Sequence, residues 1–109
     1  MKRNPKLFLC DISESIDLIE KYIKGETYKK FIANNELQDA VIRRLGIIGE
    51  AAKSVPTDIK KKNPNIPWKQ MAGMRDMITH EYFGIIMKRI WDTAKKDLPK
   101  LKKQIEKLL

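Results

Sequence analysis

Residues 35–55 read NELQDAVIRRLGIIGEAAKSV, and this stretch decides the fold class. Its apolar side chains recur at steps of three and four residues, which is the spacing of one face of an α-helix. The face consists of Leu37, Val41, Leu45, Ile48, Ala52 and Val55. Gly46 and Gly49 lie inside it. Because a glycine costs a helix about 1 kcal/mol relative to alanine, these two glycines favour a close approach of another helix.

The same periodicity precedes this stretch. Asn4 followed by Pro5 is typical of a helix start. The apolar stripe that follows ends before Gly25, which supplies the stop. Thr27 is a candidate cap for a short helix that ends near residues 34–35. The N-terminal third of the chain is therefore predicted to be helical.

Helical signals also follow Pro56. Thr57 is expected to cap a single turn that reaches residues 60–62. Pro67 is expected to open a helix that runs to about Tyr82, with Gly84 as its end. A last helix covers residues 86–108, and Pro99 should kink or restart it.

No alternating β pattern is present, and 109 residues give room for one domain. The sequence therefore predicts a single domain, residues 1–109, with an all-α fold: an antiparallel helical bundle of four to five helices.

The charge balance indicates the kind of partner. There are 23 basic and 14 acidic residues, a net charge of +9, which favours RNA, DNA or an acidic protein. Eight of the basic residues lie between Lys88 and Leu109. No apolar run approaches the roughly 20 residues of a membrane span, and the N-terminus has no signal-peptide core, so the expected location is the cytoplasm. The single cysteine, Cys10, is expected to be a buried apolar residue.

Candidate chemistry centres on His80, because it is the only histidine. A histidine-rich or cysteine-built metal site within one chain is excluded, and there is no glycine-rich phosphate loop, so neither metal nor cofactor is expected. On an ideal helix Arg75, Thr79 and Tyr82 share one face, whereas His80 lies about 140° around from Arg75. Arg75 and His80 can therefore meet only if the helix ends near His80 or if a second copy of the chain supplies complementary groups.

A purely structural interpretation stands beside this one. His80 can be a polar residue near a helix end with no catalytic role, and Arg75 can simply pair with Asp76 or another acid. Three methionines at three-residue steps, Met71, Met74 and Met77, are expected to pack in the core or in a dimer contact. The tryptophans, Trp68 and Trp91, are expected to be packing anchors.

The pattern Arg-x-x-x-x-His-x-Tyr, residues 75–82, resembles the signature of the HEPN superfamily. Its surroundings resemble the HepT-like branch over nearly the whole chain. The matching segments are AVIR at 40–43, IIGEAAK at 47–53, IPW at 66–68, MAGMR at 71–75, YFG at 82–84, Trp91 and DLP at 97–99. The sequence departs from the branch at Asp76, at Gly46 and at Ile85-Ile86. At the position of Asp76 the branch usually has a polar residue, often asparagine.

This resemblance implies a HEPN-like helical bundle that forms a homodimer with both motifs facing a shared cleft. It implies a metal-independent RNA endonuclease that is the toxin of a type VII-like toxin–antitoxin system. A nucleotidyltransferase antitoxin would neutralise it by transferring AMP to Tyr82. His80 suits proton transfer near neutral pH, and Arg75 suits a phosphate because its planar fork stays charged. Asp76 and Thr79 would support the site.

Two other functions remain open. One is a non-catalytic HEPN-like module that binds a nucleotide or the partner, which the negative charge of Asp76 favours. The other is a DNA-binding protein that uses the basic C-terminal helix, and a helix projecting free of the bundle would favour it.

Overall fold

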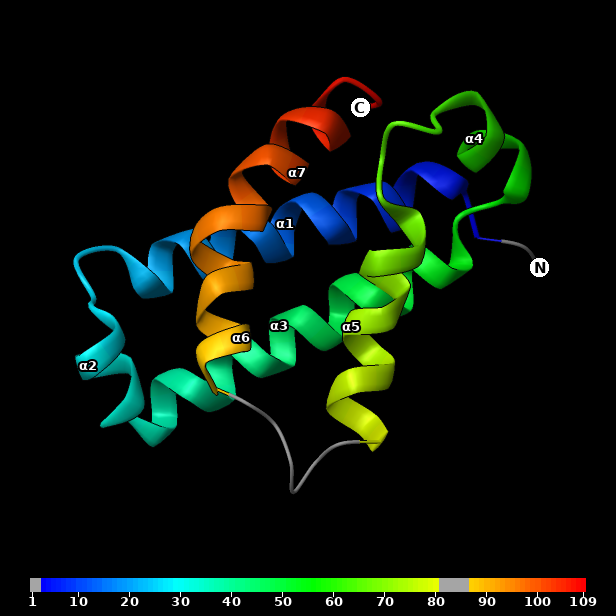
Figure 1. Cartoon of the computed structure of the whole chain (residues 1–109). Coiled ribbons are helices and arrows are strands. Elements are labelled where there is room, and N and C mark those ends of the chain that lie inside the picture. The colour runs from blue at the N-terminus through cyan, green and yellow to red at the C-terminus, as the bar shows by residue number, and fades with distance from the viewer. Residues whose placement is uncertain (1–2, 81–86) are drawn as a thin grey trace.

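Two long helices, α1 (Pro5–Ile23) and α3 (Asn35–Ser54), lie side by side and run in opposite directions (Figure 1). The computed structural model describes residues 3–80 and 87–109, apart from the side chains of Met77, Thr79 and His80. The other helices are α2 (Tyr28–Ile32), α4 (Thr57–Lys62), α5 (Trp68–His80), α6 (Met87–Asp92) and α7 (Leu98–Glu106), and a π-helical segment, η2 (Thr93–Asp97), joins the last two. The described residues contain no strand, so the predicted all-helical fold is confirmed. No helix within them is both long and apolar enough to cross a membrane.

The helix starts follow from short-range capping. The side chains of Asn4, Thr27 and Asn34 accept hydrogen bonds from the first free backbone N–H groups of α1, α2 and α3. Gly25 has a φ of +77°, a conformation that glycine adopts without strain, and it follows α1 as predicted. The prediction for Thr57 was wrong. Pro56 occupies the N-cap position of α4, because its carbonyl oxygen accepts the first hydrogen bonds of the turn and Thr57 is already helical.

One apolar core joins these helices. α1 contributes Leu9, Ile12, Ile16 and Ile19, and α3 contributes the face predicted from its sequence. Cys10 is exposed, contrary to expectation. A step of one residue turns a helix by about 100°, which moves Cys10 off the buried face that Leu9 and Ile12 define.

The C-terminal helical segment is interrupted where Pro99 predicts it. Pro99 stands in the first turn of α7, and the wide π-helical turn of η2 comes directly before it. The N–H of Leu98 bonds to the carbonyl of Thr93, five residues back. Because a proline ring clashes with the carbonyl four residues earlier in a regular helix, this wider turn accommodates the ring without breaking the helix.

Candidate active site at the seam between α3 and α5

The backbones of α3 and α5 approach each other closely at Gly49. A Cβ atom at this position would lie 2.6 Å from the backbone nitrogen of Arg75, 2.7 Å from its Cβ and 3.0 Å from the carbonyl oxygen of Met71. Gly49 is therefore required for this packing. At Gly46 a Cβ would meet no atom of the described residues within 4 Å, so the predicted close approach is confirmed for Gly49 and stays a prediction for Gly46. We call this contact line, with Gly49, Glu50, Lys53, Arg75 and Asp76, the α3–α5 seam.

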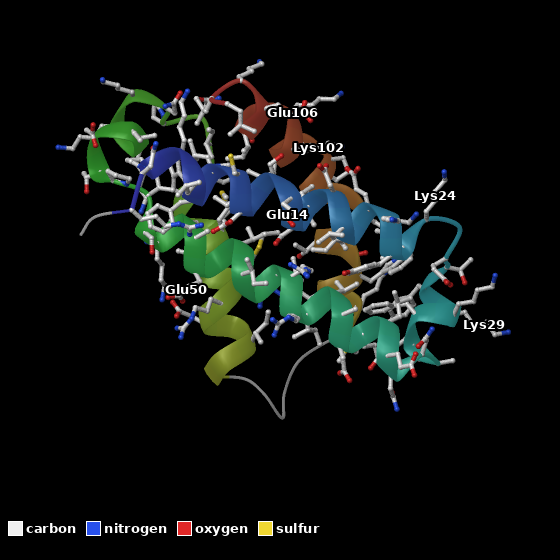
Figure 2. All side chains as sticks on the ribbon, turned by 180° about the vertical axis from the view of Figure 1, so that it is seen from behind. Glu14, Lys24, Lys29, Glu50, Lys102 and Glu106 are labelled. Carbon is white, nitrogen blue, oxygen red and sulfur yellow. The ribbon has the colours of Figure 1, made fainter. Side chains whose placement is uncertain are left out.

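An ion pair crosses the seam beside Gly49. The Nε atom of Arg75 contacts Oε2 of Glu50, so Arg75 pairs with an acid other than its neighbour Asp76. Figure 2 shows Glu50 on α3 next to the ribbon of α5. The Arg75 side chain is 41% exposed. The guanidinium also carries two Nη nitrogens, and the edge that they form has the geometry for bidentate contact with a phosphate.

A second ion pair lies next to the first. Lys53 Nζ is 2.7 Å from Asp76 Oδ1, and both side chains are partly exposed. Lys53 stands three residues after Glu50 on α3, and Asp76 follows Arg75 on α5. The two ion pairs are therefore adjacent contacts between the helices. The positive group comes from α5 in the first pair and from α3 in the second.

The remaining predicted residues lie at the far end of α5 or beyond it. Thr79 and His80 belong to its last turn, and His80 is its last residue. Their side chains are not among those described, so their contacts with Arg75 stay a prediction. Tyr82, Gly84, Ile85 and Ile86 lie outside the described residues, as does the predicted end of the helix.

Met71 and Met74, the two methionines of α5 whose side chains the structure describes, differ in burial. Met71 is fully buried in the chain's own core, whereas Met74 is only partly buried against it. Met71 is thus a core residue and cannot contribute to a dimer contact. Trp68 and Trp91 are buried, as predicted for packing anchors, and Trp68 Nε1 donates to the carbonyl of Asn63 at 3.0 Å.

The basic C-terminal helix does not project from the bundle. Leu98, Leu101 and Ile105 are buried, and α7 packs on α1. Lys102 lies 3.0 Å from Asp17 and 3.1 Å from Glu20, and hydrogen bonds to these two carboxylates raise the pKa of Lys102 above its ordinary value. The feature that would favour DNA binding through a free helix is therefore not observed.

Two cavities lie among the described residues, and the smaller of them adjoins the site. The larger, of about 620 Å³, separates α5 from α6 and η2 and is lined by Gln70, Gly73, Met74, Lys88, Arg89 and Asp92 among others. Gly73 lies about 160° around an ideal helix from Arg75, so the part of this groove that Gly73 lines faces away from the arginine. The smaller, of about 150 Å³, adjoins the seam, since Glu50 lines it together with Arg3 and Phe8. Within residues 3–80 and 87–109, no three His, Cys, Asp or Glu side chains are grouped to hold a metal ion.

Sequence reasoning did not identify Glu50 or Lys53 as site residues. A signal was present, because Gly49 was expected at a helix–helix contact and the charged residues that follow it on the same face would border that contact. Which acid pairs with which base depends on the register of two helices that are far apart in the sequence. Periodicity within one helix does not give that register.

The fold and the seam define a small helical protein that presents an arginine at the start of an Arg-x-x-x-x-His-x-Tyr motif. The family model described as ribonuclease HepT-like matches residues 12–108. A probable ribonuclease HepT of Thermococcus cleftensis is 47% identical over 108 residues, which are 99% of this chain and 98% of that protein. Two putative RNases of Methanocaldococcus jannaschii are each 46% identical over 108 residues, covering 99% of this chain and 89% and 93% of their own lengths. No solved structure matches.

The chain therefore belongs to the HepT-like ribonuclease family of the HEPN superfamily, as its motifs predicted.

Proposed function

We propose that this protein is a metal-independent RNA endonuclease that acts as a homodimer, with Arg75 and His80 as its catalytic residues. The observation that carries the proposal is the position of Arg75: its backbone is packed against Gly49, its guanidinium is ion-paired with Glu50, and its side chain is partly exposed at the head of the family motif. The relatives named as ribonucleases support RNA as the substrate.

The chemistry needs proton transfer and charge stabilisation. The 2′-hydroxyl oxygen of the RNA forms a bond to phosphorus while the bond from phosphorus to the 5′ oxygen breaks, which leaves a 2′,3′-cyclic phosphate. One imidazole takes the 2′ proton, and another gives a proton to the departing oxygen. Arg75 donates to the phosphate oxygens, whose negative charge grows in the transition state. Thr79 and Asp76 flank these groups on α5.

We propose a dimer because the reaction uses two imidazole groups and one chain has a single histidine. One chain has one histidine, and on an ideal helix it points about 140° away from Arg75. A two-fold dimer places two histidines and two arginines around one scissile phosphate. Met74 and Arg75 are the residues of α5 that we expect near this interface. A monomer at micromolar concentration by light scattering would contradict this part of the proposal.

Regulation is proposed to act on Tyr82. A nucleotidyltransferase antitoxin transfers AMP from ATP to the tyrosine oxygen with release of pyrophosphate, as in a type VII-like toxin–antitoxin system. Tyr82 is two residues from His80, so the added nucleotide places bulk and negative charge where the substrate phosphate binds. Intact mass after co-expression with the antitoxin should rise by AMP units in the wild type and stay unchanged in Tyr82→Phe. Equal addition to both would place the acceptor elsewhere.

The experiment that tests the activity is RNA cleavage in EDTA by Arg75 variants. Arg75→Ala should lower cleavage by at least about 100-fold, and Arg75→Lys should recover little because a point charge does not replace a planar fork. Lys103→Ala removes the same charge from an exposed position of α7 and should cleave normally. Full activity of a folded Arg75→Ala protein would favour the non-catalytic binding module.

A further inference from the structure

The larger cavity is an open groove of about 620 Å³, with α5 on one side and α6 and η2 on the other, and we call it the α5–α6 groove. Figure 1 shows α5 and α6 on the same side of α3. The α5 wall of the groove is apolar and half-buried, with Pro67, Gly73 and Met74. The rim is polar and exposed, with Gln70, Lys88, Arg89 and Asp97. A volume of this size is typical of small-molecule sites in proteins.

Two cations stand together on the α6 side of the rim. Lys88 Nζ lies 3.2 Å from Asp92 Oδ1 and 4.8 Å from the centroid of the Tyr28 ring, so two contacts hold this side chain. Arg89 is exposed, and in the part of the chain that the structure describes no acidic side chain pairs with it. Such a guanidinium suits a phosphate, because its planar fork donates hydrogen bonds to two oxygens at once.

The α5 wall leads along the helix to the proposed catalytic histidine. Gly73 and His80 are seven residues apart on α5. Seven residues make nearly two full turns, so the two positions lie within about 20° of each other around an ideal helix and about 10 Å apart along it. Arg75 is on the far side of the helix from Gly73, and Met74 lies between them. Within one chain, the groove therefore shares its face of α5 with position 80 and not with Arg75.

We propose that the α5–α6 groove binds one unpaired nucleotide of the RNA, next to the scissile phosphate, so that the substrate class is single-stranded RNA. This inference rests on the proposed function. The base packs on Gly73 and on the thioether of Met74, which makes favourable contacts with aromatic rings. Gln70 offers an amide to the hydrogen-bonding edge of the base. Arg89 binds the phosphate of the same nucleotide, with Lys88 beside it.

The depth of the α5 wall is the reason for an unpaired nucleotide. Gly73 and Met74 are half-buried, so a ligand contacts them fully only by entering the groove. The bases of an RNA duplex are stacked and paired, whereas an unpaired base can be splayed out and bound on its faces and edges. A duplex therefore reaches only the cations of the rim, which bind the phosphates of either form.

The test fills the groove from Gly73 and measures RNA binding. A Cβ at Gly73 would meet no atom of the described residues within 4 Å, so Gly73→Ala and Gly73→Leu fit on the backbone. Binding is measured by fluorescence polarisation of a short, labelled RNA of mixed sequence, both as a single strand and annealed to its complement. Every protein, the parent included, carries His80→Ala so that the probe stays intact.

Gly73→Leu should weaken binding of the single strand about tenfold or more, which is the size of one lost base contact, and leave binding of the duplex unchanged. Gly73→Ala adds one methyl group and should bind nearly as well as the parent. Both variants should unfold at a higher temperature, because alanine and leucine favour a helix more than glycine does. A loss of binding beside a gain in stability does not come from a damaged fold.

Arg89→Ala tests the phosphate end of the groove. It should weaken binding of the single strand and of the duplex about three- to tenfold at low salt, and lower the slope of log affinity against log salt by about 0.7 for the single strand. The matched control is Lys103→Ala, which removes one positive charge from an exposed position of α7. Lys103 lies about 160° around an ideal helix from Leu101, which lines the groove, so this variant should bind both probes like the parent.

The outcomes separate the inference from the function on which it rests. Binding of the single strand by Gly73→Leu as tight as by the parent, or an equal loss for single strand and duplex, would overturn the inference. A dimeric parent and a monomeric Gly73→Leu protein in light scattering would also overturn it, since the groove would then be a contact between two copies of the chain. Cleavage that does not depend on His80 would overturn the proposed activity, whereas the Gly73 variants would still report on the groove.

Discussion

Among the described residues, ion pairs join α1 to α7 on one face of the bundle and α3 to α5 on another. The two faces differ in what sets the distance between the paired helices. On the α1–α7 face, Leu98, Leu101 and Ile105 fill the contact, and Lys102 pairs with Asp17 and Glu20 outside it. At the α3–α5 seam a glycine brings the backbones together, and the ion pairs lie directly beside that contact.

Because of this difference, we expect surface ion pairs of similar geometry to have different consequences. Exposed ion pairs contribute little to the free energy of unfolding. We therefore expect the apolar contact, and not the ion pairs of Lys102, to hold α7 on α1. At the α3–α5 seam each pair includes a residue of the proposed site, Arg75 in one and Asp76 in the other. Their importance should appear in activity rather than in stability.

Among the substitutions considered, replacement of Gly49 should have the largest effect on RNA cleavage, because it disrupts the contact between α3 and α5. Gly49→Ala places a methyl group 2.6 Å from the Arg75 backbone nitrogen, so α5 must shift. Overpacking of this kind costs about 1–3 kcal/mol, partly offset by about 1 kcal/mol of helix propensity. Because misplacement by about 1 Å costs catalysis about 100-fold, RNA cleavage should fall by that order.

Gly46→Ala is the matched control for that substitution. It adds the same methyl group three residues earlier on α3, where no atom of the part of the chain that the structure describes lies within 4 Å. It should raise the free energy of unfolding by up to about 1 kcal/mol and leave cleavage unchanged. Equal losses of cleavage in the two variants, measured beside thermal unfolding, would show that the close approach at Gly49 does not position Arg75.

Replacement of Glu50 should have a smaller effect than replacement of Gly49. It should lower kcat and raise the affinity for RNA. Glu50→Ala frees the Arg75 side chain from its orienting contact, so kcat should fall about tenfold. It also removes a negative charge from the seam, so KM for RNA should fall. Glu50→Gln keeps an oxygen that can accept from Nε and should retain more of kcat than Glu50→Ala. A rise in KM with unchanged kcat would contradict the orienting role.

Replacement of Lys102 should have the smallest effect. Its pKa is raised by hydrogen bonds to Asp17 and Glu20, so its contribution to stability is fully present below the ordinary lysine pKa of 10.5. That contribution is lost as pH rises through the raised value. Lys102→Met should therefore unfold at a slightly lower temperature than the wild type at neutral pH, with the gap closing in strongly alkaline solution. A gap independent of pH would mean that packing of the lysine stem, not its charge, matters.

The sequence predicted what depends on neighbours along the chain. Asn4, Thr27 and Gly25 act within one turn of their own positions, and the α3 face follows from periodicity, so these features were confirmed. The predictions for Cys10 and Thr57 were wrong by one position. Cys10 follows the buried Leu9 but is exposed, and Pro56, the residue before Thr57, is the N-cap of α4. Arg75, Asp76 and His80 could be named from the sequence, since they belong to one motif. Glu50 and Lys53 could not be, because their roles arise from the register of α3 against α5.

We propose that His80 acts in RNA cleavage together with Arg75, whose backbone is packed at the α3–α5 seam. The most direct measurement is cleavage of RNA in EDTA by purified wild-type and His80→Ala proteins, with circular dichroism and light scattering on the same samples. We expect the variant to keep the helical spectrum and the mass of the wild type while cleavage disappears. Wild-type-level cleavage by a folded His80→Ala protein, free of contaminating nuclease, would contradict the claim.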